Sequence, residues 1–252
     1  MVKLERMVGF LDEYLKTVEF KDHSWNGLQF EGAGAVGKVA FAVDAGVDAF
    51  REAAAAGAQM LVVHHGHFWR GTNPSYASWG KKRLDILMEN SLSLYASHLP
   101  LDHHPVVGNN AQLLKLIGAK VTGEFGSYGG RSIGWRGRLS RPLTVDAIAG
   151  KLESELGASC RVLPFGPGKV STVAALSGGG GYDIFFEALD SGVDLYVTGD
   201  SIEVYHTAKD AGLNVIFGGH HATETAGLKA LRKVVEKRFR VETVFIDIPT
   251  GL

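Results

Sequence analysis

The chain has 252 residues, of which 45% are hydrophobic and 21% charged, a balance typical of a soluble globular protein with one large domain or two small ones. Its 27 acidic side chains nearly cancel its 26 basic ones, so net charge gives no support to nucleic acid as a partner. The single cysteine, Cys160, excludes an internal disulfide and a thiolate-rich zinc site, and it fits a reducing cytoplasm. No apolar run reaches the roughly 20 residues that a membrane span requires.

Alternating helix and strand patterns occupy the first part of the chain. Leu4 to Val18 has the three-and-four apolar spacing of an amphipathic helix. Val36 to Val43 is predicted to be a buried strand and Asp48 to Ala56 a helix closed by glycine. Met60 to Val63 is predicted to be a second strand that runs directly into a pair of histidines.

The same strand, helix, strand order recurs in the second half. It is repeated by Val173 to Leu176, Ile184 to Leu189 and Ser191 to Val197, which favours an internal duplication. The similarity extends further along both halves: a predicted helix at Leu84 to Asn90 and strand at Leu92 to His98 align with a helix at Thr207 to Gly212 and a strand at Asn214 to His220. In this alignment His98 falls on His220 and Asp102 on Glu224. The sequence therefore predicts an α/β protein with mixed sheets flanked by helices. We expect a first αβ half at 1–125, a small αβ connector at 126–169 with a helix at Val145 to Leu156, and a second αβ half at 170–252.

Histidine and glycine are both frequent in this chain. It has ten histidines and 33 glycines, whereas average usage predicts roughly 18 glycines. Eight histidines lie in three short windows that each follow a predicted strand, where sites of α/β proteins are usually built. The windows contain His64, His65 and His67; His98, His103 and His104; and His220 and His221.

The spacing of these residues indicates metal ligands. His64 and His65 are adjacent on an extended chain, so we expect them to point apart and to serve different ions. His220 and Glu224 are four apart at the start of a predicted helix and share a face. His98 and Asp102 have the same spacing, but Pro100 predicts a loop there.

Two carboxylates, Asp102 and Glu224, could supply oxygens to a pair of cations about 3.5 to 4 Å apart. Nitrogen and oxygen donors without sulfur suit zinc, manganese, iron, cobalt or nickel. The alternative is a buried hydrogen-bond network, but converging carboxylates and histidines need charge neutralisation, which a metal provides.

Other candidates are less specific. The glycine run that follows Ser177 (178–181) could offer backbone N–H groups to a phosphate, but a tight turn is the favoured interpretation. Asp200, Glu203 and His206 could act as acids or bases near the metals, or form a solvated helix face.

Several motifs, in order over nearly the whole chain, resemble the GTP cyclohydrolase 1 type 2 homologs, the YbgI-like, NGG-interacting-factor-like dinuclear-metal proteins. The matching stretches are Asn26-Gly27-Leu28-Gln29, Val63-His64-His65-Gly66, Phe68-Trp69, His98-Leu99-Pro100-Leu101-Asp102, Gly108-Asn109-Asn110-Ala111-Gln112-Leu113, Thr198-Gly199-Asp200, Gly219-His220-His221-Ala222-Thr223-Glu224 and Phe245-Ile246-Asp247-Ile248-Pro249.

The resemblance implies two intertwined αβ domains related by duplication, assembled as a ring-shaped homohexamer. It also implies two metal ions per chain, with Glu224 reaching both, and five ligands: His64, His65, Asp102, His220 and Glu224. Two departures are small: Asp200 stands where the family often has glutamate, and His206 matches a later family histidine only loosely.

Two functions are expected from these residues. The first is a metal-dependent hydrolase that acts on a nucleotide-like or other small substrate through a metal-activated water, with His98 orienting it or relaying a proton. Only the family label suggests GTP cyclohydrolase chemistry. The alternative is a non-catalytic metal-binding ring or scaffold whose partner is a protein or single-stranded nucleic acid.

Overall fold

The computed structural model describes all 252 residues and divides into two compact units. Unit 1 comprises Met1–Leu101 and Leu228–Ile248, and unit 2 comprises Asp102–Gly227 and Pro249–Leu252. The chain therefore leaves unit 1, builds unit 2 and returns to unit 1, and its last four residues, Pro249–Leu252, belong to unit 2. None of the helices combines the length and apolar character needed to cross a membrane.

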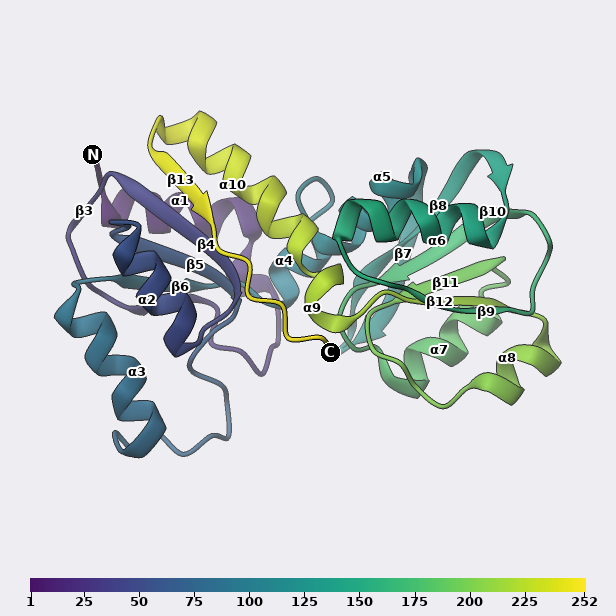
Figure 1. Cartoon of the computed structure of the whole chain (residues 1–252), viewed down its shortest axis with the longest axis horizontal. Helices are drawn as coiled ribbons and strands as arrows, with labels where there is room; N and C mark the ends of the chain where they lie inside the picture. The colour runs from purple at the N-terminus through teal and green to yellow at the C-terminus, as the bar shows by residue number, and fades with distance from the viewer. The chain divides into compact units, whose positions relative to one another are not determined.

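Unit 1 is built on a five-stranded mixed sheet (Figure 1). In spatial order its strands are β13 (Glu242–Phe245), β4 (Lys38–Asp44), β5 (Met60–His65), β6 (Ser93–Ala96) and β2 (Gly27–Phe30). The first four run parallel, and β2 pairs antiparallel with β6. The short strands β1 (Val2–Lys3) and β3 (Ala35–Val36) form a separate antiparallel pair.

Unit 1 also contains helices, most of which bury apolar side chains. They are α1 (Leu4–Leu15), the 3₁₀ turn η1 (Thr17–Glu19), α2 (Val47–Ala55), α3 (Ser78–Glu89) and most of α10 (Thr225–Phe239). Helix α1 ends three residues before its predicted end because Lys16 adopts the left-handed conformation, with φ 55°. Phe50 of α2 and Leu87 of α3 are fully buried in one core with the inner residues of β4, β5 and β6.

Unit 2 is built on a six-stranded mixed sheet (Figure 1). In spatial order its strands are β7 (Ala119–Tyr128), β8 (Arg131–Leu143), β10 (Val170–Leu176), β11 (Leu195–Thr198), β12 (Asn214–Phe217) and β9 (Arg161–Pro164). Strands β10, β11 and β12 run parallel, whereas β8 and β9 pair antiparallel at either side of them.

Helices also flank the second sheet. They are α4 (Leu99–His103, which begins in unit 1), α5 (Asn109–Ile117), α6 (Val145–Leu156), α7 (Gly181–Asp190), α8 (Tyr205–Ala211) and α9 (His220–Thr223). Helices α5 and α6 bury Leu114, Ile148 and Leu152 in a core with β10, β11 and β12. Helix α6 has the predicted bounds, with Thr144 accepting a hydrogen bond at its N-terminus and Gly157 left-handed after its end.

Each sheet therefore contains three successive parallel strands with an antiparallel strand beside the third, which confirms the mixed α/β class. The predicted histidine windows follow the third strand in both units and the second strand in unit 1. Each unit therefore carries candidate ligands at its own strand ends.

Candidate metal centre

Three histidines cluster at the carboxyl ends of β5 and β6 in unit 1. His64 and His65 are the last residues of β5, and His98 follows β6 by two residues. One ring nitrogen from each lies within 4.8 Å of those of the other two, a spacing that could hold a metal ion. His64 is fully buried, whereas His65 and His98 are partly exposed.

The expectation that His64 and His65 point apart was wrong. Their ring centroids are 4.7 Å apart, and that of His98 is 5.0 Å from the ring of His64. Strand alternation holds within a pleated strand, but His65 is the residue at which β5 ends, so the constraint is lost there.

The Nδ1 atom of each of these three histidines contacts an oxygen acceptor. His64 Nδ1 is 3.0 Å from the backbone oxygen of Ser97. His65 Nδ1 is 2.8 Å from Asp44 Oδ1, and His98 Nδ1 is 2.9 Å from Asp22 Oδ1. An acceptor at Nδ1 favours the tautomer that carries its proton there, so that Nε2 carries the lone pair that a metal needs.

Asp22 organises the loop around His98 as well as its ring. The buried carboxylate accepts hydrogen bonds from the backbone N–H groups of Ser24 and Leu99 and from the side chain of Asn26. Burial alone would raise the pKa of Asp22, but the hydrogen bond and charge of His98 lower it to about 2, aided by Asn26 and Ser24. Asp22 is therefore a carboxylate at neutral pH.

In unit 2, Asp102 occupies a polar, buried environment. Its Oδ1 accepts hydrogen bonds from Asn109 Nδ2 and Ser177 Oγ, both at 2.8 Å. Asp102 lies in helix α4, so the loop predicted from Pro100 was wrong. Proline is tolerated in the first turn of a helix, because its missing N–H would have no intrahelical partner there.

His220 and Glu224 meet as their four-residue spacing predicted. His220 Nε2 is 3.2 Å from Glu224 Oε1, and His220 Nδ1 is 2.8 Å from Asp200 Oδ1. Glu224 is only 2% exposed. The hydrogen bond that His220 donates to Glu224 raises the pKa of His220 to about 9 against the opposing effect of burial, and Asp200 adds to the rise. A carboxyl oxygen of Asp102 lies within 4.8 Å of one from Glu224.

The donor set of each unit suits a divalent transition metal. Imidazole nitrogens and carboxylate oxygens are its common ligands, and a carboxylate or carbonyl behind the imidazole is the usual support for a metal-binding histidine. His220, held between Asp200 and Glu224, takes a proton in the metal-free chain, and a cation can replace that positive charge. The residues therefore fit the predicted metal chemistry.

The carboxylates that contact the Nδ1 atoms of these histidines were not predicted from the sequence. Asp22 and Asp44 were not among the candidates, and Asp200 was assigned no firm role. No local pattern indicates them, because each is at least 20 residues away from its histidine in the chain.

The remaining histidines of the windows have other surroundings. His103 stacks on Trp135 at 4.7 Å, and His104 Nδ1 accepts hydrogen bonds from two backbone N–H groups that follow it. His67 packs edge-on against Phe68. His221 is buried. Outside the windows, His206 is exposed on α8 beside Tyr205.

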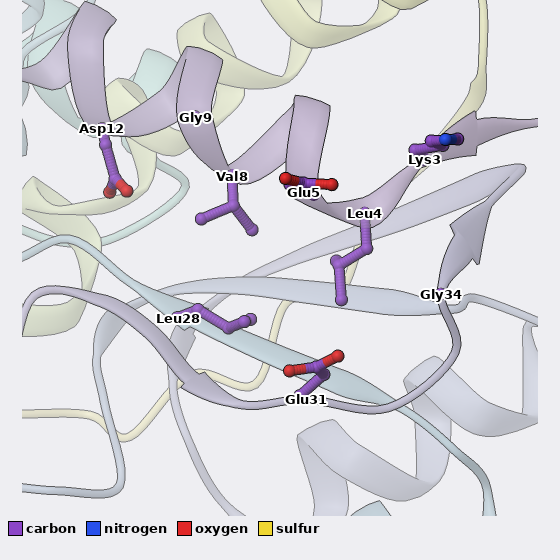
Figure 2. A pocket seen from close by; sticks show the side chains of 9 residues that line it. All are labelled: Lys3, Leu4, Glu5, Val8, Gly9, Asp12, Leu28, Glu31 and Gly34. Carbon is purple, nitrogen blue, oxygen red and sulfur yellow. The ribbon is translucent and has the colours of Figure 1, made fainter.

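A separate groove of about 570 Å³ lies between α1 and β2 in unit 1 (Figure 2). Leu4, Val8 and Leu28 supply apolar side chains to it, and three carboxylates, Glu5, Asp12 and Glu31, line it as well. It contains none of the sequence-predicted site residues, so it is no part of the candidate metal centre.

Several known proteins are similar to this chain over its whole length. The family described as DUF34/NIF3 (NGG1p interacting factor 3) matches residues 2–251. An Archaeoglobus fulgidus protein named GTP cyclohydrolase 1 type 2 homolog is 46% identical over 252 residues, covering both chains completely. The Escherichia coli K12 protein of the same name is 37% identical over 98% of this chain and 99% of its own length.

Solved structures share the fold at similar identity. The protein ybgI, described as of unknown function, has a TM-score of 0.92 at 36% identity, and a Thermus thermophilus protein has 0.89 at 37%. Both comparisons cover all of this chain and all of the other. With the family match over residues 2–251, these full-length similarities show that the chain belongs to the DUF34/NIF3 family.

Proposed function

We propose that the protein is a dinuclear metal-dependent hydrolase that acts on a nucleotide-like or other small substrate. One observation carries this proposal: in each of four histidines the Nδ1 atom contacts an oxygen acceptor. The four are His64, His65, His98 and His220. A purely structural histidine needs no common orientation, whereas a metal ligand needs its Nε2 lone pair fixed in direction.

The proposed ligands are His64, His65, Asp102, His220 and Glu224, with Glu224 reaching both ions. When bound, two divalent ions would lower the pKa of a water molecule and stabilise negative charge on the substrate. Zinc, manganese, iron, cobalt and nickel all suit this donor set. We further propose that the chain assembles as a homohexameric ring, as the family resemblance implies.

His98 is proposed to orient the reacting water or to relay its proton. The Asp22 carboxylate holds His98 Nδ1 at 2.9 Å, so the ring presents Nε2 on its other side. Asn26 Oδ1 accepts from the backbone N–H of His98 at 2.8 Å and fixes the start of the loop. This arrangement is what a general base needs: one nitrogen held and the other directed toward the reaction.

The test is hydrolysis of a substrate panel by the metal-loaded protein. The panel contains nucleotides, cyclic nucleotides and phosphoesters, each tried with zinc, manganese, iron and nickel. We expect turnover of at least one compound and its loss in Glu224→Gln, which keeps the size of the side chain and removes its charge. Glu155→Gln, a matched change at an exposed position of α6, should retain full activity.

Circular dichroism of both variants controls for unfolding. Absence of turnover with every metal and compound would instead favour the non-catalytic ring or scaffold protein. Turnover that survives Glu224→Gln would contradict the proposed role of Glu224.

A further inference from the structure

The glycine run between β10 and α7 packs directly against the residues around His220. A side chain on Gly178 would overlap Glu224 Oε1, and one on Gly179 would overlap Asp200 Oδ2. A side chain on Gly180 would lie 2.7 Å from the hydroxyl of Tyr196. Three successive missing side chains thus leave room for three different groups, two of which contact His220.

Gly179 is a glycine for reasons of space rather than of backbone conformation. Its φ lies outside the left-handed region, in which a glycine is needed for its backbone freedom. Gly181 shows the opposite case, because its φ is +60° and a side chain there would meet nothing within 4 Å. Gly178 combines both demands, with φ +60° and the overlap with Glu224.

The two crowded carboxylates differ in their freedom to move. Glu224 is 2% exposed, so it has nowhere to go if Gly178 gains a side chain. The Asp200 side chain is 43% exposed and can swing into solvent. A methyl group at position 179 would therefore displace Asp200 without requiring the fold to change.

We propose that Gly179 is a positioning residue for the His220 ligand: its bare α-carbon leaves the space from which the Asp200 carboxylate holds His220 Nδ1. The chain of contacts runs from Gly179 to Asp200 Oδ2, and from Asp200 Oδ1 to His220 Nδ1 at 2.8 Å. The importance of this contact for metal binding rests on the proposed function, but the contact itself does not.

The first experiment examines the metal-free protein. Proton NMR should show a slowly exchanging, downfield Nδ1–H resonance of His220, identified by its absence in His220→Gln. We expect Gly179→Ala to lose this resonance and to keep those of His65 and His98, which have their own carboxylate partners. Gly150→Ala is the matched control, since Gly150 has open space and no positive φ.

The second experiment titrates Zn²⁺ into the same proteins by calorimetry. Loss of a hydrogen-bonded partner behind a ligand typically weakens metal affinity about 10–100-fold, which is the weakening expected for Gly179→Ala and for Asp200→Ala. The double variant Gly179→Ala/Asp200→Ala should bind as Asp200→Ala does, because the methyl group acts only through Asp200.

The outcomes separate the two proposals. Wild-type protein that takes up no Zn²⁺ would contradict the proposed function, while the NMR experiment would still decide the role of Gly179. Wild-type affinity and an intact His220 resonance in Gly179→Ala would overturn the positioning role. Should Gly179→Ala fail to fold, recovery of folding in the double variant supports the overlap with Asp200, and its absence refutes it.

Discussion

At the scale of single residues, the carboxylate that accepts a hydrogen bond from His98 also affects the free energy of unfolding. Asp22 accepts four hydrogen bonds from His98 and its neighbours while it is buried. Such a carboxylate stabilises the fold only in its charged form, because protonation removes its charge and part of its accepting capacity. Its low pKa therefore predicts a pH-dependent contribution to stability.

Asp22→Asn should lower the free energy of unfolding of the metal-free protein at pH 7. The pKa of Asp22 falls from 3.8 to about 2 on folding, which corresponds to about 2 kcal/mol. Because the folded pKa is the lower one, this stabilisation is complete above the unfolded pKa and disappears as pH falls through about 2. The difference in the free energy of unfolding between wild type and Asp22→Asn should therefore become smaller below about pH 4.

Urea unfolding between pH 7 and pH 3, with chelator present, measures this difference. Asp210→Asn, at an exposed position of α8, should show no such narrowing. A gap between Asp22→Asn and wild type that stays constant over this pH range would contradict the assigned role of Asp22.

The ligand histidines and their acceptors differ in how far sequence predicts them. The apolar pattern of a strand ends just before or at each of four histidines: His64, His65, His98 and His220. These positions can therefore be predicted from the neighbouring sequence alone. Asp22 and His98 are 76 residues apart and meet because β2, which follows Asp22, pairs with β6, which precedes His98. Contacts of this kind leave no periodic or motif signal in one sequence.

At the scale of elements, glycine has different roles in different places. Gly179 gives room to a carboxylate, whereas Gly9 lies in the middle of helix α1 with nothing within 4 Å of where its side chain would be (Figure 2). A glycine inside a helix loses more backbone freedom on folding than alanine does. Gly9 therefore weakens α1 without a packing benefit in this chain.

Gly9→Ala should raise the free energy of unfolding by about 0.5–1 kcal/mol. The same change at Gly57 should lower it, because Gly57 has φ +73° although it too has open space around it. Chemical denaturation of the three proteins gives both comparisons. A Gly9→Ala protein no more stable than wild type would show that the position makes a contact that requires glycine.

The wrong expectations at this scale have local physical reasons. Pro100 suggested a loop but sits in the first turn of α4, and His65 escapes strand alternation because β5 ends there. Helix α6 has its predicted bounds, and a capping threonine and a left-handed glycine define its two ends. Boundaries with a chemical signal are thus predictable, and those set by packing are not.

At the scale of the whole molecule, the strand, helix, strand blocks were predicted from sequence, whereas the strand that returns from the end of the chain was not. Strands β4, β5 and β6, and likewise β10, β11 and β12, follow from strand, helix, strand blocks that are local in the chain. Strand β13 instead returns from the end of the chain to pair with β4, with Glu242 opposite Lys38. Such long-range pairing carries no local pattern.

The metal content of the chain tests the central proposal most directly. Protein purified without added metal and analysed by inductively coupled plasma mass spectrometry, then titrated with Zn²⁺, should reach two ions per chain when saturated. That stoichiometry is the one that the family resemblance implies, and the proposed ligands are His64, His65, Asp102, His220 and Glu224. Fewer than one transition-metal ion per chain, with no uptake on titration, would contradict it.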